Sequence, residues 1–255
     1  MLKPSALQQK AWKKKPLLWL LHISGMTKHV IFHATSHEEV QEIETAFGNR
    51  SINVISNVPS MPDSDLSNHI RIPGTARLCF VGRVHPIKNL LWLLELMKRV
   101  ASTCHLTVVG PMEDESYWQA CIRTIKELPK NVSVEFVGVQ VEDVVRQHLA
   151  ESDALILPTL GENFGHAIFE SLAAGTPVII SDQTIWRNLT TRNAGWDLSL
   201  DDGEGFVNAI EEVAHMTSES HHVWRAGALR TAQMFVDEND FHTLYQTMFF
   251  HDSAL

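Results

Sequence analysis

The sequence predicts an α/β protein whose main part is a Rossmann-like parallel sheet with helices on both faces. From Arg77 onward, short apolar runs typical of buried strands alternate with segments whose apolar residues recur at helical spacing, which indicates βαβ units. The chain has 255 residues, enough for one large domain or two small ones. Its content of 44% hydrophobic and 20% charged residues is ordinary for a globular protein.

The first part of the chain, residues 1–70, predicts a smaller βαβ fragment followed by a linker. A β-type run at 30–34 precedes a helix at 36–47, and a second strand covers 52–55. Residues 57–76 are rich in Pro, Ser and Asp, a composition typical of a domain boundary.

The second part, residues 71–235, predicts a complete doubly wound domain. Strands are predicted at 78–82, 105–110, 132–138, 154–157 and 177–180, with one further short strand at 196–198. Helices are predicted at 90–100, 117–128, 144–150, in the segment after Glu162, and at 203–216. Residues 219–250 are predicted to be helical throughout.

Composition and charge exclude several classes of protein. The formal net charge of −9 argues against broad nucleic-acid binding, because such binding needs a basic face. The apolar run at 17–21 is too short to span a bilayer, and the lysines at 13–15 stand where a signal peptide requires apolar residues. Cys79, Cys104 and Cys121 form no CxxC pair, which is typical of a reducing compartment. We therefore expect a cytoplasmic protein.

Only the start of the chain is basic. Its lysines precede the first acid, Glu38, and they are Lys3, Lys10, Lys13, Lys14, Lys15 and Lys28. Together with Trp12 and Trp19 they allow two interpretations. One is an interfacial helix in peripheral contact with anionic lipid at the inner membrane surface. The other, which we favour, is a solvated helix face whose end packs in the core.

Glu162 and Glu170 are the most informative pair of residues, because they flank a predicted loop-to-helix junction with seven residues between them. Phe164, Gly165 and His166 open the helix, so their backbone N–H groups have no partner within it. Such a helix start attracts anions, by about 0.3–1 kcal/mol per charge when exposed. A ligand with a phosphate at its centre and hydroxyl groups at both ends fits this arrangement.

Cations are predicted on the same rim of the sheet. Ligands of open α/β sheets bind outside the carboxyl ends of the strands, and Arg83 and Lys88 follow the strand at 78–82. Either one alone would be interpreted as a solvated surface cation. Their shared placement with Gly165 favours a diphosphate, which suits both side chains. Glu170, which has apolar neighbours, can accept hydrogen bonds from two hydroxyl groups of a ribose.

Other motifs are absent or uninformative. No Gly-x-Gly-x-x-Gly follows a predicted strand, which argues against a nicotinamide dehydrogenase, and no Gly-Lys-Ser/Thr predicts a P-loop. Asp63-Ser64-Asp65 imitates a DxD metal motif, but it falls in the Pro-rich linker and we interpret it as a loop. The 14 histidines show no spacing typical of metal ligands, and we interpret His221 and His222 as part of an exposed helix. No metal site is predicted.

Three motifs, in this order, resemble the C-terminal half of the glycosyl transferases group 1, the retaining GT-B glycosyltransferases of family 4. They are Gly82-Arg83 with Lys88-Asn89, then Phe136-Val137-Gly138, then Glu162 and Glu170 followed by Ala173-Ala174-Gly175-Thr176-Pro177-Val178. The resemblance covers about residues 77–200. It implies a GT-B C-terminal domain at 71–235, a remnant of the N-terminal acceptor domain with its linker at 1–70, and a helix at 236–255 that crosses back to the N-terminal domain.

The resemblance also implies residue roles. Glu162 would contact hydroxyl groups of the donor sugar and Glu170 the ribose of the nucleotide. Arg83 and Lys88 would neutralise the diphosphate as it leaves, and with Glu162 they form the expected catalytic set. The other residues expected to surround the donor are Gly82, Gly138, Val139, Gln140, Asn163, Phe164, Gly165, His166 and Ala167. Of these, residues 164–167 would hold sugar and phosphate through their backbone, and residues 138–140 would flank the base.

The activity implied by the resemblance is transfer of a sugar, with retention of configuration, from a UDP-, GDP- or ADP-sugar to a glycan or lipid-linked acceptor. No metal or other cofactor is expected, because fixed cations and the helix start can stabilise the charge that develops on the diphosphate. A full two-domain member of the family is much longer. We therefore expect this chain to carry mainly the donor site and to have little transfer activity by itself.

Two alternatives remain open. The chain could be a non-catalytic, nucleotide-sugar-binding subunit of a split transferase, with a partner that supplies the missing acceptor domain. It could also be another GT-B enzyme, such as a nucleotide-sugar epimerase or a phosphorylase. A phosphorylase would need a pyridoxal lysine.

Overall fold

The computed structural model describes residues 16, 19–21, 24–34, 37–55, 61, 70–239 and 243. The chain divides into two compact units, Met1–Val58 with Asn239–Leu255, and Pro59–Glu238. Most of the basic start, the Asp63-Ser64-Asp65 motif, and the segment from 240 onward apart from Thr243 lie outside the described residues.

The first unit contains the βαβ fragment that the sequence predicts. Its elements are η1 (Met26–His29), β1 (Phe32–Ala34), α3 (His37–Phe47) and β2 (Ile52–Val54). The two strands pair in parallel, with Phe32 opposite Ile52. Ala34, Ile43 and Phe47 form the core, and the rings of Phe32 and Phe47 stack with their centroids 5.3 Å apart. A two-stranded sheet of this size is marginal for independent stability.

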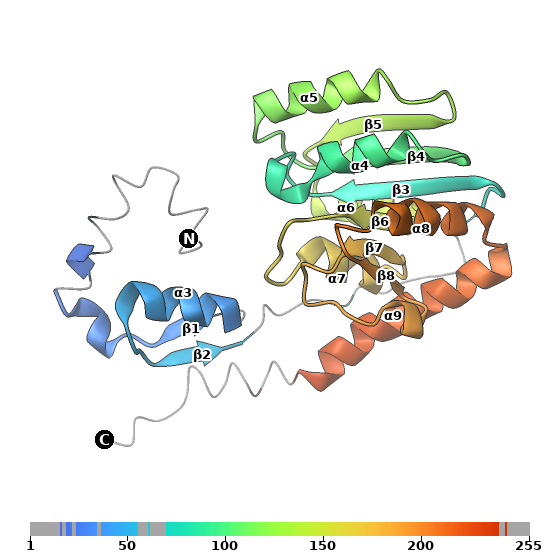
Figure 1. The fold of residues 1–255 in the computed structure, drawn as a ribbon. Helices are drawn as coiled ribbons and strands as arrows, with labels where there is room; N and C mark the ends of the chain where they lie inside the picture. The colour runs from blue at the N-terminus through green and yellow to red at the C-terminus, as the bar shows by residue number, and fades with distance from the viewer. Residues whose placement is uncertain are drawn as a thin grey trace. The chain divides into compact units, whose positions relative to one another are not determined.

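The second unit is built on a six-stranded sheet in which every strand runs parallel to its neighbours (Figure 1). Its strands are β3 (Thr75–Val81), β4 (Thr103–Val109), β5 (Val132–Gly138), β6 (Ala154–Leu157), β7 (Val178–Ser181) and β8 (Gly195–Leu198). Their order across the sheet is β5-β4-β3-β6-β7-β8. Strands β6 and β7 are buried along their whole length, which explains their uninterrupted apolar sequences.

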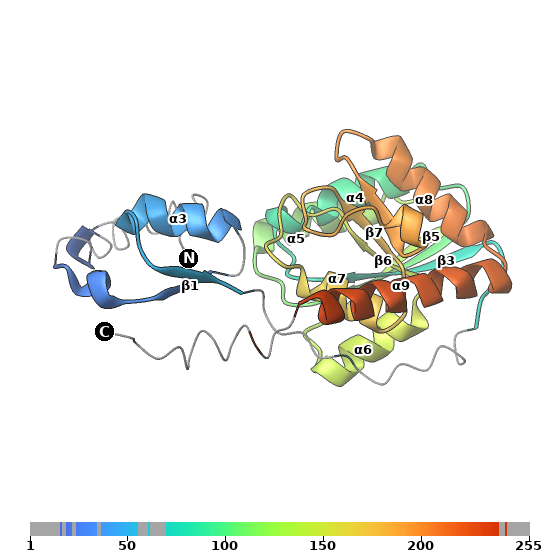
Figure 2. The same cartoon turned by 90° about the horizontal axis from the view of Figure 1, so that it is seen from below.

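Helices cover both faces of this sheet, so the predicted Rossmann-like fold is confirmed (Figure 2). One face carries α4 (Leu90–Met97), α5 (Glu115–Ile125) and α8 (Gly203–His215), and the other carries α6 (Glu142–Glu151), α7 (His166–Ala173) and α9 (Ser218–Glu238). Two short 3-10 helices, η3 (Pro86–Lys88) and η4 (Thr190–Arg192), lie in connecting loops.

The direction of strand order reverses between β3 and β6. From β3 the chain proceeds outward through β4 to β5, and α6 then returns it to β6 on the other side of β3. The loops after β3 and β6 therefore lead to helices on opposite faces of the sheet. In open α/β sheets, ligands bind at such a switch point, outside the carboxyl ends of the strands.

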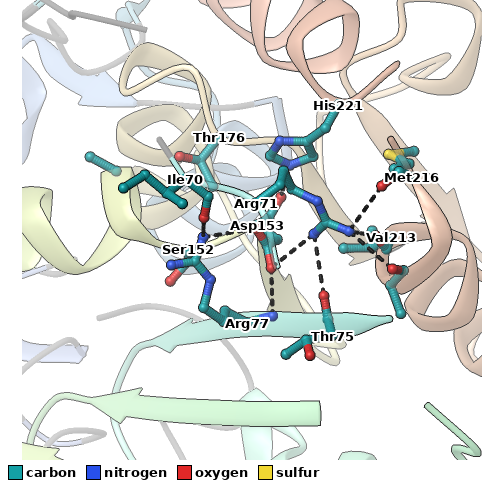
Figure 3. Close-up of polar contacts among 12 residues, drawn as sticks. Ile70, Arg71, Thr75, Arg77, Ser152, Asp153, Thr176, Val213, Met216 and His221 are labelled. Carbon is teal, nitrogen blue, oxygen red and sulfur yellow. Dashed lines mark hydrogen bonds and ion pairs between the residues drawn. The ribbon is translucent and has the colours of Figure 1, made fainter. Parts of the chain in front are cut away.

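A buried polar network lies at the opposite, amino edge of the sheet (Figure 3). The Asp153 carboxylate, fully buried, forms ion pairs with Arg71 at 3.0 Å and Arg77 at 3.2 Å. The Arg71 guanidinium also donates hydrogen bonds to carbonyl oxygens at the end of α8. These belong to Val213, Ala214 and Met216, at 2.7, 3.0 and 3.2 Å. The network thus joins the starts of β3 and β6 to α8.

Two predictions are corrected by the structure. The helix predicted at 219–250 is interrupted: α9 ends at Glu238, and Asn239, a poor helix former, forms a bend. Beyond Asn239 the described residues include only Thr243, which is helical, so the rest of this prediction lies outside them. His221 is expected from the sequence to lie on an exposed helix, but it is only 1% exposed. Its Nε2 lies 2.8 Å from the Asp153 carbonyl oxygen, so the histidine belongs to the buried network.

Candidate functional site

All predicted site residues lie in segments at the carboxyl edge of the sheet. Gly82, Arg83 and Lys88 follow β3, Gly138 ends β5 and is followed by Val139 and Gln140, and Glu162, Asn163, Phe164 and Gly165 follow β6. His166, Ala167 and Glu170 belong to α7. Since β5, β4, β3 and β6 are consecutive in the sheet, these segments span three strand spacings, roughly 14 Å.

Lys88 and Glu162 form an ion pair across the switch point. The two side chains are only 14% and 16% exposed. Beneath them, the backbone N–H of Leu160 donates to the Ile87 carbonyl oxygen at 2.8 Å, and the Thr159 hydroxyl donates to the same oxygen at 3.1 Å. The loops after β3 and β6 are therefore held together, and their charged side chains meet.

Local sequence explains how Lys88 is presented. Pro86 begins η3, where its missing N–H costs nothing, and the His85 Nδ1 accepts a hydrogen bond from the Ile87 N–H at 3.2 Å. Asn89 then adopts a left-handed conformation with φ of 61°, which asparagine tolerates better than most residues. The turn ends there, and α4 begins at the next residue.

Arg83 forms a second ion pair at this edge, with Glu113 at 2.6 Å. Both side chains are about half exposed. Glu113 lies in the loop after β4, whose Pro111 carbonyl accepts a hydrogen bond from the Val84 N–H at 2.8 Å. The loops approach so closely that a Cβ on Gly110 would lie 2.2 Å from the Gly82 carbonyl oxygen. Glycine is therefore required at position 110.

Gly165 is the residue that allows α7 to start where it does. Its φ of 79° is left-handed, and a Cβ there would lie 2.8 Å from Ile168 Cδ1. Its carbonyl oxygen accepts hydrogen bonds from Ile168 and Phe169 at 2.9 and 3.0 Å. The N–H groups of Gly165, His166 and Ala167 precede these bonds and form the electropositive end of the helix.

Glu170 is half-buried in the first turns of α7, beside α6. Burial raises the pKa of Glu170, the nearby Glu142 raises it further, and Arg146 opposes the shift. Arg146 itself pairs with Asp143 at 2.7 Å and with Glu142 at 3.4 Å. The ionised form of Glu170 is therefore disfavoured in the ligand-free chain, and groups that donate hydrogen bonds to it would stabilise that form.

The end of β5 presents apolar side chains and a backbone turn. Gly138 has a φ of 71°, and the Gln140 side-chain amide donates to the Val137 carbonyl oxygen at 2.8 Å. Val139 and Val141 are 71% and 70% exposed. The loop after β5, the edge strand of the sheet, thus offers apolar side chains beside polar backbone groups.

Two residues at this edge were not predicted from the sequence. Glu113 follows β4, and Trp186 follows β7, where its indole N–H donates to the Phe164 carbonyl oxygen at 2.8 Å. The rule that ligands bind beyond the carboxyl ends of strands applies to these loops as well, so it could have drawn attention to both segments. Their contacts, however, could not be read from the sequence.

The described residues also bear on reactive cysteines, metal sites and membrane-spanning helices. Burial raises the pKa of Cys79 and Cys104 to about 12, which makes both thiols poor nucleophiles. Within the described ranges, His, Cys, Asp and Glu form no group of three or more that could hold a metal ion. No helix in this part of the chain is long and apolar enough to cross a membrane.

Residues 75–216 match the model of the family described as glycosyl transferases group 1. The lipopolysaccharide core biosynthesis glycosyltransferase LpsE of Rhizobium meliloti is 30% identical over 135 residues, which are 52% of this chain and 38% of that protein. The O-antigen chain mannosyltransferase RfbU of Salmonella typhimurium is 24% identical over 136 residues, 53% of this chain and 38% of that protein. The chain therefore spans less than half the length of these relatives.

Solved structures agree with the fold. The crystal structure of Anabaena Alr3699/HepE in complex with UDP and glucose superposes with a TM-score of 0.72 at 16% identity. The match covers 100% of this chain and 70% of that one. At this level of identity the likeness concerns the GT-B fold alone.

Proposed function

The chain belongs to the glycosyl transferases group 1, and from this membership we propose that residues 71–235 form the donor-binding half of a glycosyltransferase. The proposed reaction transfers a sugar from a nucleotide diphosphate sugar to an acceptor, with retention of configuration and without a metal. The observation that carries the proposal is the meeting of Lys88 and Glu162 at the switch point, four residues before α7 begins.

In the proposed reaction, the bond between the anomeric carbon and the diphosphate oxygen breaks, and the electron pair remains on the diphosphate. An acceptor hydroxyl oxygen forms the new bond to the anomeric carbon, and the hydroxyl proton passes to the departing diphosphate. The developing charge needs fixed positive partners. Lys88 and Arg83 lie on one side of the switch point, and the N–H groups that open α7 lie on the other. Two cations and a helix start can together neutralise the leaving group, so the chemistry does not call for a metal.

In this proposal, the ion pairs of Lys88 and Arg83 exchange partners when the donor binds. Each cation is paired with a carboxylate, Glu162 or Glu113. When a diphosphate enters, it competes with these carboxylates for the two cations. Glu162 then becomes available to accept hydrogen bonds from hydroxyl groups of the donor sugar. The diphosphate thus replaces Glu162 as the partner of Lys88, and the sugar replaces Lys88 as the partner of Glu162.

We assign the nucleoside to the two remaining predicted segments. Ribose hydroxyl groups donate to Glu170, and these hydrogen bonds offset the burial and the nearby Glu142 that raise its pKa. The base lies against residues 138–140, where exposed Val139 supplies apolar contact. The Anabaena structure contains UDP and glucose, which supports a nucleotide-sugar donor; UDP-, GDP- and ADP-sugars remain the candidates.

For the acceptor we propose a glycan or a lipid-linked glycan, because the two curated relatives are named for lipopolysaccharide core and O-antigen synthesis. The acceptor-binding residues would come from an N-terminal domain, of which the described residues of the first unit form the parallel strands β1 and β2. We also propose a cytoplasmic location, in which the basic start makes a peripheral contact with the membrane surface.

A second candidate is a nucleotide-sugar-binding subunit that completes a split transferase. It is favoured by the small parallel pair β1–β2, whose buried core contains only Ala34, Ile43 and Phe47 among the described residues. A defined partner carrying acceptor-domain strands would restore transfer only in this case. Assays of the chain with and without such a partner separate the two candidates.

A thermal-shift screen with UDP, GDP and ADP tests the donor site. A ligand at about 100 times its Kd stabilises the native state by about 2.7 kcal/mol, which for a domain of this size raises Tm by roughly 5–10 °C. We expect one of the three nucleotides to give such a shift and its parent nucleoside to give a smaller one. The absence of a shift with all three would contradict the proposal.

A further inference from the structure

Trp186 lies directly behind the loop that opens α7. Its side chain is only 5% exposed, although the residues on either side of it, Ile185 and Arg187, are exposed. The indole N–H donates to the Phe164 carbonyl oxygen at 2.8 Å. Trp186 is thus turned inward between two exposed neighbours, and its indole bonds to the backbone of the proposed donor site.

This hydrogen bond determines how the peptide between Phe164 and Gly165 is oriented. In a planar trans peptide, the C=O and the N–H point in opposite directions. Since the Phe164 carbonyl points to the Trp186 indole, the Gly165 N–H points away from it. Gly165 has a left-handed φ of 79° and can rotate more easily than other residues. A fixed partner is therefore needed to hold its N–H in one direction.

Aromatic packing holds the indole itself in place. The Trp186 ring lies 6.0 Å from the ring of Phe164, 6.1 Å from Phe169 and 5.0 Å from Phe235. Phe235 belongs to α9, and its ring also lies 5.5 Å from Phe164. Rings at these separations pack favourably and leave little freedom for rotation. The cluster of Phe164, Phe169, Trp186 and Phe235 thus joins α7, the loop after β7, and α9.

A second bond joins the same two loops. The Glu162 N–H donates to the Gln183 carbonyl oxygen at 3.1 Å. The loop after β7 therefore contacts the donor loop at two points, one at Glu162 and one at Phe164. Of the two, only the contact from Trp186 is made by a side chain, so only this one can be removed by substitution.

We propose that Trp186 is a positioning residue of the donor site, which directs the Gly165 N–H toward the diphosphate of the nucleotide. The inference rests on the proposed donor site. Trp186 acts through the Phe164–Gly165 peptide and does not touch the ligand. Its loss should therefore weaken the binding of phosphate groups while leaving the binding of the nucleoside unchanged.

Trp186→Phe tests this, because it keeps an aromatic ring and removes the N–H. Trp196→Phe is the matched control: Trp196 is also buried, its indole N–H donates to Glu212 at 3.3 Å, and it stacks on Trp224. Affinities are measured for whichever of UDP, GDP and ADP the wild type binds, and for its parent nucleoside. We expect Trp186→Phe to raise the Kd of the diphosphate about fivefold, from the loss of one hydrogen bond. The nucleoside Kd should change less than twofold, and Trp196→Phe should change neither.

A second measurement on the wild-type chain covers the case in which Trp186→Phe fails to fold. In a tryptophan-labelled sample, the Trp186 indole signal should shift when the nucleoside diphosphate is added and stay in place with the nucleoside. The Trp196 signal should not respond to either ligand. Three results would overturn the inference and leave the proposed function intact. They are an equal loss of affinity for diphosphate and nucleoside in Trp186→Phe, an unchanged Kd of the diphosphate in that variant, and a Trp186 indole signal that does not shift when the diphosphate is added. Failure of the wild type to bind any of the three diphosphates would overturn the proposed function, and the inference with it.

Discussion

Lys88 and Glu162 satisfy each other's charge across the point where the strand order of the sheet reverses. Both side chains are largely buried, so their attraction is screened less by solvent than that of a surface pair. The family resemblance assigns the lysine to the diphosphate and the glutamate to the sugar. The structure shows one ion pair between these two side chains, and on the proposed roles a donor would have to replace it.

Glu162→Gln should therefore change the affinities for nucleoside diphosphate and for nucleotide sugar in opposite directions. Without the carboxylate, Lys88 is available to the diphosphate, and we expect the Kd of the nucleoside diphosphate to fall about threefold. The Kd of the nucleotide sugar should rise instead, because the sugar hydroxyls lose a charged acceptor. Titration calorimetry with both ligands measures the two effects.

Glu113→Gln is the control for this experiment. It releases Arg83 from an ion pair whose side chains are about half exposed, and such pairs contribute only about 0–1 kcal/mol. We expect a smaller gain in affinity, equal for the diphosphate and the nucleotide sugar. If Glu162→Gln changes the Kd of the diphosphate and the Kd of the nucleotide sugar equally and in the same direction, the proposed exchange of partners at Lys88 is wrong.

Glu170 should make nucleotide binding depend on pH. Burial raises the pKa of Glu170, Glu142 adds to the shift, and Arg146 opposes it. The folded chain therefore holds this proton to a higher pH than the unfolded chain, and its stability falls as the pH rises from the unfolded pKa through the folded pKa. Ribose hydroxyls bind the ionised form, so affinity should instead increase over the same pH range.

The matching substitution is Glu170→Gln, which cannot ionise. We expect it to stabilise the ligand-free chain at neutral pH and to remove the part of the pH dependence of binding that belongs to this carboxyl. Calorimetric Kd values for wild type and variant between pH 5 and pH 8 provide the comparison. Parallel pH profiles for the two proteins would contradict the assignment of Glu170 to the ribose.

Asp153→Ala should destabilise the second unit strongly. The substitution leaves Arg71, whose side chain is 2% exposed, and Arg77 without the carboxylate that they share. Removal of one partner from a buried ion pair typically costs about 3–5 kcal/mol. The free energy of unfolding, from urea denaturation, should fall by that amount.

Arg99→Ala is the control, because it breaks the exposed ion pair of Arg99 with Glu204. It should lower the free energy of unfolding by less than about 1 kcal/mol. A loss as small as this for Asp153→Ala would contradict the structural role of the network.

Strands β6 and β7 can be predicted from the sequence because they are buried along their whole length. A short, uninterrupted apolar run between two helices, such as residues 154–157, is typical of a buried parallel strand. The positions of the site residues followed from the same reading, since a parallel sheet collects all carboxyl ends at one edge. Glu162 and Glu170 were found because the start of a helix is visible in the local sequence.

The contacts that complete the site were not predictable, because they join segments that are distant in the chain. Trp186 bonds to a carbonyl 22 residues away, and Glu113 reaches an arginine 30 residues away. His221 was misjudged for the same reason: its partner, the Asp153 carbonyl, lies 68 residues earlier. Local sequence patterns indicate which face of a helix is apolar. They do not indicate which polar group, distant in the chain, forms a hydrogen bond with a buried histidine.

Calorimetric titration of the nucleoside diphosphates into the wild-type chain and into Glu170→Ala tests the central claim most directly. Glu151→Ala is the control, because Glu151 is an exposed carboxylate that ends α6 at the amino edge of the sheet. We predict that the wild type and Glu151→Ala bind one of UDP, GDP and ADP with equal affinity. Glu170→Ala should bind the same nucleotide about tenfold or more weakly, because it loses hydrogen bonds to a charged group. No binding by the wild type, or equal binding by Glu170→Ala, would contradict a donor site at this edge of the sheet.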